Sequence, residues 1–176
     1  MESSQKQRVL PLLLALLFGG GVAQAAEETS LIAFELKDQF GEVHRAVDFA
    51  GKVLVLIGSD KDGSSFNGKW GGAIYEAVKE EPGIELFTTV ACADLRGVPF
   101  FIKGMVKSKF PQVRDQWVLM DWKGQLAKAY SFEPDSSNIV VFAADGRLMH
   151  HAHGRELESA TLDEIVAVLR DLLATP

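Results

Sequence analysis

The sequence of 176 residues contains one cysteine, Cys92. A chain with a single thiol has no internal disulfide and no C-x-x-C pair, which excludes disulfide exchange through a second, resolving thiol. Long apolar runs are missing too. The apolar stretch at 9–17 is shorter than the roughly 20 residues that a helix needs to cross a bilayer. Internal repeats and low-complexity tracts are also absent. The chain must therefore be stabilised by packing rather than by disulfides.

Basic residues are fewer than acidic residues. The chain carries 18 Lys and Arg against 24 Asp and Glu, which gives a net charge of −6. An acidic chain in which the sequence shows no basic cluster argues against nucleic acid or anionic lipid as a partner.

The first residues have the pattern of a secretory signal peptide. Lys6 and Arg8 precede the apolar run, and Ala23-Gln24-Ala25 supplies the small residues that a signal peptidase reads. We predict cleavage after Ala25, export to the periplasm, and a single mature domain at 26–176. No cysteine lies near the cleavage region, so a lipid-anchored signal is not indicated, and we expect no stable membrane anchor after cleavage.

Strand-like and helix-like patterns alternate along the mature chain. The run at 53–57 is aliphatic throughout, as in a central strand covered on both faces, whereas the apolar residues at 66–78 recur every four positions, as in an amphipathic helix. We predict further strands at 34–37, 43–47, 84–91, 117–120, 139–142 and 148–151, and further helices at 98–110, 124–130 and from Thr161, where Glu164 would complete a capping box. This order predicts an α/β fold with a central mixed sheet between helical layers.

Local motifs sharpen this prediction. The GKVLVL stretch at 51–56 resembles the segment before the active site of redoxins, and the LMD at 119–121 with Gly124 and the Ala-Tyr pair at 129–130 resembles a later redoxin segment. The VVFAADGR stretch at 140–147 resembles the strand and turn after the family's cis-proline. The chain therefore resembles the thioredoxin-like superfamily over about 34–173. This resemblance implies a three-layer α/β/α sandwich.

The positions that carry redox chemistry in that superfamily differ here. The C-x-x-C position corresponds to Gly63-Ser64-Ser65-Phe66, and the cis-proline position falls near Ser137. A serine hydroxyl without a base is too weakly acidic to replace a thiolate. The P-x-x-x-[TS]-x-x-C pattern of peroxiredoxins is absent as well. The chain most resembles the YtfJ-type family of periplasmic proteins, which implies a redox-inactive binding or accessory domain with no cofactor and with an unidentified protein or small-molecule partner.

Cys92, at the end of a predicted strand, supports an alternative function. It would act as the only thiol of a peroxiredoxin-like antioxidant enzyme. The simpler interpretation is a small buried residue at the end of the strand, because free cysteine is among the most buried residue types.

The histidines at 150, 151 and 153 suggest a less favoured function as a metal carrier. On a strand, His151 and His153 point to the same face and form a candidate pair of Zn or Cu ligands with His150 nearby. A third ligand on that face would have to come from elsewhere, so a solvated strand face is the simpler interpretation.

The loop that opens the first long helix is the candidate ligand site. Asp60, Asp62, Ser64 and Ser65 lie there, with Ser137 at the cis-proline position. The loop has a partial resemblance to a calcium loop, but its twelfth position is Gly71 rather than an acid. Its polar residues are also typical of a helix cap.

Phe100 and Phe101 are adjacent in the predicted helix at 98–110. Neighbouring residues do not share one helix face. Either one of them is exposed and marks a partner surface, or the helix is buried on two sides.

Overall fold

The computed structural model describes residues 30–174, so the predicted signal peptide lies outside the described residues. The strands are β1 (Glu35–Lys37), β2 (Val43–Arg45), β3 (Val53–Ser59), β4 (Phe87–Asp94), β5 (Val118–Asp121), β6 (Ser137–Phe142) and β7 (Leu148–Gly154). The α-helices are α1 (Ser64–Val78), α2 (Lys103–Lys107), α3 (Gln125–Ala129) and α4 (Ser159–Ala174), and the 3-10 turns are η1 (Ala46–Phe49), η2 (Ile84–Leu86) and η3 (Phe100–Ile102). Within this range no helix combines the length and apolar character that a bilayer crossing requires.

Five strands form a mixed central sheet in the order β5-β4-β3-β6-β7. β3 pairs in parallel with β4, and β4 with β5, while β6 pairs antiparallel with both β3 and β7. The strands β1 and β2 form a separate antiparallel hairpin. The Asp145-Gly146 turn joins β6 to β7, and Gly146 has the positive φ of 87° that such a turn requires.

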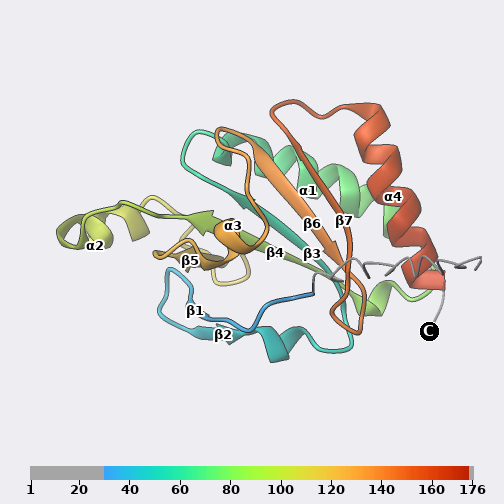
Figure 1. Ribbon diagram of the computed structural model, residues 1–176, viewed down its shortest axis with the longest axis horizontal. Helices are drawn as coiled ribbons and strands as arrows, with labels where there is room; N and C mark the ends of the chain where they lie inside the picture. The colour runs from blue at the N-terminus through green and yellow to red at the C-terminus, as the bar shows by residue number, and fades with distance from the viewer. Residues whose placement is uncertain (1–29, 175–176) are drawn as a thin grey trace, which may run out of the picture.

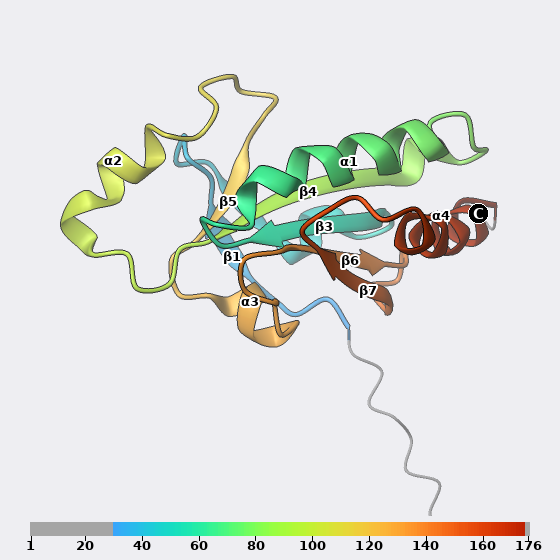
Figure 2. The same cartoon turned by 90° about the horizontal axis from the view of Figure 1, so that it is seen from above.

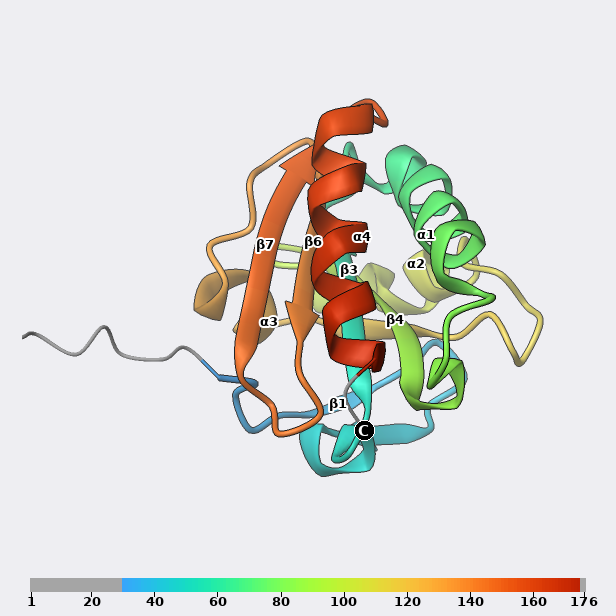
Figure 3. The same ribbon diagram turned by 90° about the vertical axis from the view of Figure 1, so that its right-hand side faces the viewer.

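Two apolar clusters on opposite faces of the sheet hold the layers together. Val53, Val55 and Ile57 of β3 pack with α1 and α4 on one face. Leu54 and Leu56 pack with α3 and the β1–β2 hairpin on the other. Because successive strand residues point to opposite faces, the aliphatic run of β3 at 53–57 serves both layers. Figures 2 and 3 show α1 and α4 on one side of the sheet and α3 on the other, as the predicted α/β/α sandwich requires.

Three predicted element boundaries were wrong. The strand predicted at 84–91 begins only at Phe87, because Gly83 has a φ of 80° and Leu86 N–H donates to the Gly83 carbonyl in a 3-10 turn. The strand predicted at 43–47 ends at Arg45, where η1 begins. The capping box at Thr161 does not form. Helix α4 starts two residues earlier, and Leu162 N–H donates to the Glu158 carbonyl, so Thr161 lies within the first turn.

The long helix predicted at 98–110 is also wrong. This region holds η3 and the five-residue helix α2, separated from the rest of the chain by Pro99 and Pro111. We call residues 97–116 the lobe, which extends away from the sheet in Figure 1. The side chain of Gln39 holds the C-terminal end of the lobe in place. The Gln39 amide donates to the carbonyls of Pro111 and Gln116 at 3.0 Å each and accepts from Val118 N–H at 2.8 Å.

Candidate functional site

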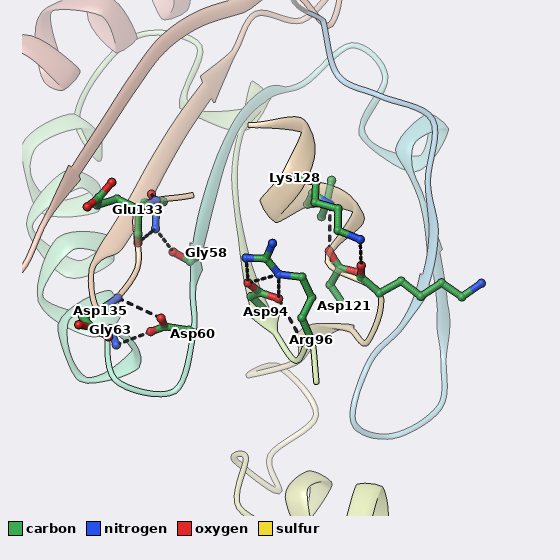
Figure 4. A network of polar contacts seen from close by, with 12 residues as sticks. Gly58, Asp60, Gly63, Asp94, Arg96, Asp121, Lys128, Glu133 and Asp135 are labelled. Carbon is green, nitrogen blue, oxygen red and sulfur yellow. Dashed lines mark hydrogen bonds and ion pairs between the residues drawn. The ribbon is translucent and has the colours of Figure 1, made fainter. Parts of the chain in front are cut away.

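The loop before α1 is closed by the carboxylate of Asp60. Its Oδ1 accepts a hydrogen bond from Gly63 N–H at 2.8 Å, and its Oδ2 accepts one from Asp135 N–H at 3.0 Å. Asp135 belongs to the segment that leads from α3 into β6, so one side chain joins the two loops that correspond to the C-x-x-C and cis-proline positions (Figure 4). Both oxygens of Asp60 are therefore engaged with the protein's own backbone.

Gly63 stands at the first cysteine position of the redoxin pattern and touches the opposite loop directly. A Cβ atom on Gly63 would lie 2.3 Å from the Ser136 carbonyl oxygen and 2.7 Å from the Ser136 nitrogen. These atoms are backbone atoms, which cannot rotate away. The structure therefore has no room for a side chain, and so for a thiol, at this position unless a loop moves.

Two asparagines complete the closure. The buried amide of Asn138 donates to the carbonyls of Gly58, Glu133 and Ser136, and its oxygen accepts from Glu133 N–H at 2.7 Å. The Asn67 amide donates to Ser59 Oγ and accepts from the Ser137 hydroxyl, each at 2.8 Å. Sequence reasoning missed both residues. The available signal was Asn138 itself, a polar residue that follows Ser137 and directly precedes the apolar run of β6.

An apolar pocket of about 560 Å³ lies beside this closed junction, between the start of α1, the β4–β5 edge of the sheet and the lobe. Ala91, Ala93 and Val118 belong to its walls on the sheet, and Val106 and Phe110 belong to its walls on the lobe. The volume falls within the range of roughly 300–1,000 Å³ that is typical of small-molecule sites.

The predicted ligand-site residues do not come together as one surface. Asp60 and Ser64 border the pocket. Asp62 and Ser65 are exposed and do not line it, and Ser137 is fully buried with its hydroxyl bonded to Asn67. Ser64 Oγ donates to the Lys61 carbonyl at 2.7 Å, which is a local loop contact. Residues 30–174 contain no cis peptide bond, so the chain enters β6 at Ser137 through a trans peptide.

Cys92 is 1 % exposed, and its side chain belongs to the core cluster on the α3 face of the sheet. Burial raises the pKa of its thiol well above the ordinary value of 9.0, and the nearby carboxylates of Asp121 and Asp94 raise it further. A thiol in this state is a poor nucleophile at neutral pH because the thiolate is the reactive form. The environment matches the simpler interpretation of a packed core residue.

The three histidines of β7 divide between its two faces. His151 and His153 are exposed on one face, as predicted, while His150 is half-buried on the other. Burial lowers the pKa of His151, with a further lowering from the neighbouring His153 and His150. Among residues 30–174, no three His, Cys, Asp or Glu side chains are grouped closely enough to hold a metal ion.

The geometry defines the class: a thioredoxin-like α/β fold whose redox positions are filled by backbone contacts and amide hydrogen bonds. Solved structures agree on the fold. The chain is similar to the exposed lipoprotein thioredoxin Etrx1 of Streptococcus pneumoniae strain TIGR4, with a TM-score of 0.59 and 20 % identity over 80 % of this chain and 100 % of that one. It is also similar to a putative thiol:disulfide interchange protein DsbE from Chlorobium tepidum, with a TM-score of 0.57 and 19 % identity over 83 % of this chain and 96 % of that one.

A third similar structure is a putative protein disulfide isomerase from Bacteroides thetaiotaomicron, with a TM-score of 0.58 and 14 % identity over 84 % of this chain and 89 % of that one. No family model and no curated protein sequence matches the chain. At these levels of identity the likeness shows the fold alone.

Proposed function

We propose that this chain is an exported thioredoxin-like protein of the YtfJ type that has lost thiol redox chemistry and serves as a binding or accessory domain. The observation that carries the proposal is the contact between Gly63 and Ser136, which fills the place of the first redox thiol with backbone. The burial of Cys92 argues against the alternative of a single-cysteine antioxidant enzyme.

Export is supported by the signal-peptide pattern that ends at Ala25. This pattern favours a periplasmic location for the mature chain.

The pocket beside α1 is the best candidate for a ligand site, and its charges favour an acidic ligand with an apolar body. Its two carboxylates are already engaged, Asp60 by backbone amides and Asp94 by the guanidinium of Arg96. The side-chain ammonium groups of its two lysines, Lys61 and Lys109, form no hydrogen bond or ion pair within residues 30–174. The charges in the pocket that have no partner are therefore the positive charges of these two lysines.

Redox inactivity is tested by measuring insulin-disulfide reduction and peroxide consumption with the purified protein and with Cys92→Ala. We expect both proteins to give the uncatalysed rates. Catalysis by the wild type that disappears in Cys92→Ala would refute the proposal in favour of the single-cysteine enzyme.

Ligand binding is tested by isothermal titration with decanoate, a carboxylate with an apolar chain. We expect saturable binding that Ala93→Phe abolishes by filling the pocket and that Lys61→Met with Lys109→Met weakens about tenfold or more, because each lysine offers a charged hydrogen bond. Lys123→Met, a change outside the pocket, is the control. Equal binding to the wild type and to a folded Ala93→Phe variant would dismiss the pocket as the site.

A further inference from the structure

The lobe exposes the largest apolar side chains at its outer surface. Phe100 is 83 % exposed, Phe101 75 % and Met105 64 %. The two phenylalanine rings meet edge to face, with their centroids 5.8 Å apart. Both phenylalanines are thus exposed, whereas the sequence interpretation expected only one of them at the surface. Adjacent exposed aromatic residues mark an interaction surface more often than a solvent surface.

This exposure is a feature of a folded segment. Val98, Val106 and Phe110 face the opposite way and pack on a small core with Leu95 and Met120. The Gln39 amide holds the C-terminal end of the lobe by two hydrogen bonds and forms a third with Val118 of β5. The lobe therefore has two apolar sides, one buried against the sheet and one without a partner in the described chain.

The charges of the lobe are mostly positive. Residues 97–116 contain Lys103, Lys107, Lys109 and Arg114 against one acidic residue, Asp115, although the whole chain has a net charge of −6. Arg114 is paired with Glu42, and the ammonium of Lys103 lies 4.6 Å above the Trp122 ring. Lys107 and Lys109 have no acidic partner within residues 30–174. The overall negative charge, which argued against anionic lipid, conceals this local basic segment.

We propose that the lobe is a membrane-docking tip, in which Phe100, Phe101 and Met105 enter the interface of an anionic lipid surface while Lys107 contacts the headgroups. Aromatic side chains beside lysines are the combination that interfacial segments use. A projecting tip suits a deformable lipid surface (Figures 1 and 2), whereas a protein partner would need a matching hollow. The acidic body and basic tip would also orient the molecule tip-first.

The experiment is vesicle co-sedimentation of the purified protein with phosphatidylcholine alone and with mixed phosphatidylglycerol and phosphatidylcholine. We expect binding to the mixed vesicles that weakens with added salt. Phe100→Ser with Phe101→Ser should lower the affinity by about a hundredfold, because each ring is worth about tenfold or more on insertion. Lys107→Gln should lower it by about fivefold, since a lysine near an anionic surface contributes about that much.

Tyr75→Ser, which removes an exposed aromatic side chain from α1, and Lys123→Gln are matched controls and should bind as the wild type does. Phe100→Trp should be quenched by brominated lipid on binding. Absence of binding to mixed vesicles, unchanged binding by the double-serine variant, or an unquenched tryptophan would each overturn the proposal and leave a protein partner as the occupant. None of these outcomes bears on the redox assays, so the two proposals fail separately.

Discussion

Gly63, in the loop before α1, packs directly against the backbone of Ser136 at the entry to β6, so Gly63→Ala should destabilise the protein. The added Cβ would meet the Ser136 backbone at 2.3 Å, whereas real Cβ contacts essentially never fall below 3.0 Å. The segment must then shift by at least about 0.7 Å, against the hydrogen bond that Asp135 N–H donates to Asp60 and the one that the Ser136 carbonyl accepts from Asn138. Overpacking of this kind costs about 1–3 kcal/mol, and the pinned loop places the expected loss in the upper part of that range.

Gly68→Ala is the matched control because Gly68 lies five residues further along the same helix. An added Cβ there has no neighbour within 4 Å. Replacing an exposed glycine inside a helix by alanine stabilises it by up to about 1 kcal/mol. The two substitutions should therefore move the free energy of unfolding in opposite directions.

Urea unfolding, followed by the fluorescence of the tryptophans, measures both changes. If Gly63→Ala unfolded within about 0.5 kcal/mol of the wild type, the size of an ordinary surface substitution, the loop would be free to move. The steric argument for the missing thiol would then fail.

Two further predictions concern buried groups. The Cys92 thiol should resist alkylation until the protein unfolds. Because burial raises the pKa of the thiol in the folded protein, its contribution to stability is present below about pH 9 and is lost as the pH rises further. Cys92→Ala should remove this loss of stability at alkaline pH. An equal loss in both proteins would contradict the assignment of the effect to Cys92. Gln39→Ala should cost about 1–3 kcal/mol, because it strips a buried partner from Val118 N–H, and should speed hydrogen exchange at that amide. Gln112→Ala, an exposed change, is its control, and unaltered exchange at Val118 would count against the reasoning.

The sequence was sufficient for the elements whose burial follows a regular pattern. The aliphatic run at 53–57 is typical of a strand in a sheet covered on both faces, and the four-residue spacing at 66–78 is typical of an amphipathic helix, and the structure forms β3 and α1 there. The lobe was mispredicted for a physical reason. Its apolar residues have helical spacing, but half of them point away from the core, and spacing alone does not say which side of a segment finds a partner.

The structure brings together the two loops from which the candidate site was predicted, but not the side chains that were predicted to form it. Matching to the redoxin pattern placed the lost thiols at 63–66, and the structure finds the same segment against the β6 entry. The closure depends on Asn67 and Asn138, which contact residues 70 and 80 positions away. Long-range polar contacts of this kind have no periodic signature, so sequence reasoning assigned the polar role to Asp62 and Ser65, which are exposed.

The lobe links the two proposals through its two faces. Its inner residues Val106 and Phe110 help to line the pocket, while its outer phenylalanines form the proposed membrane tip. Gln39 contacts neither surface, yet it bonds the backbone of Pro111 and Val118, which both line the pocket. Gln39 is therefore a positioning residue for the pocket. Its loss should weaken decanoate binding, since the pocket walls would no longer be held in place, and should leave the vesicle contact of Phe100 and Phe101 less affected.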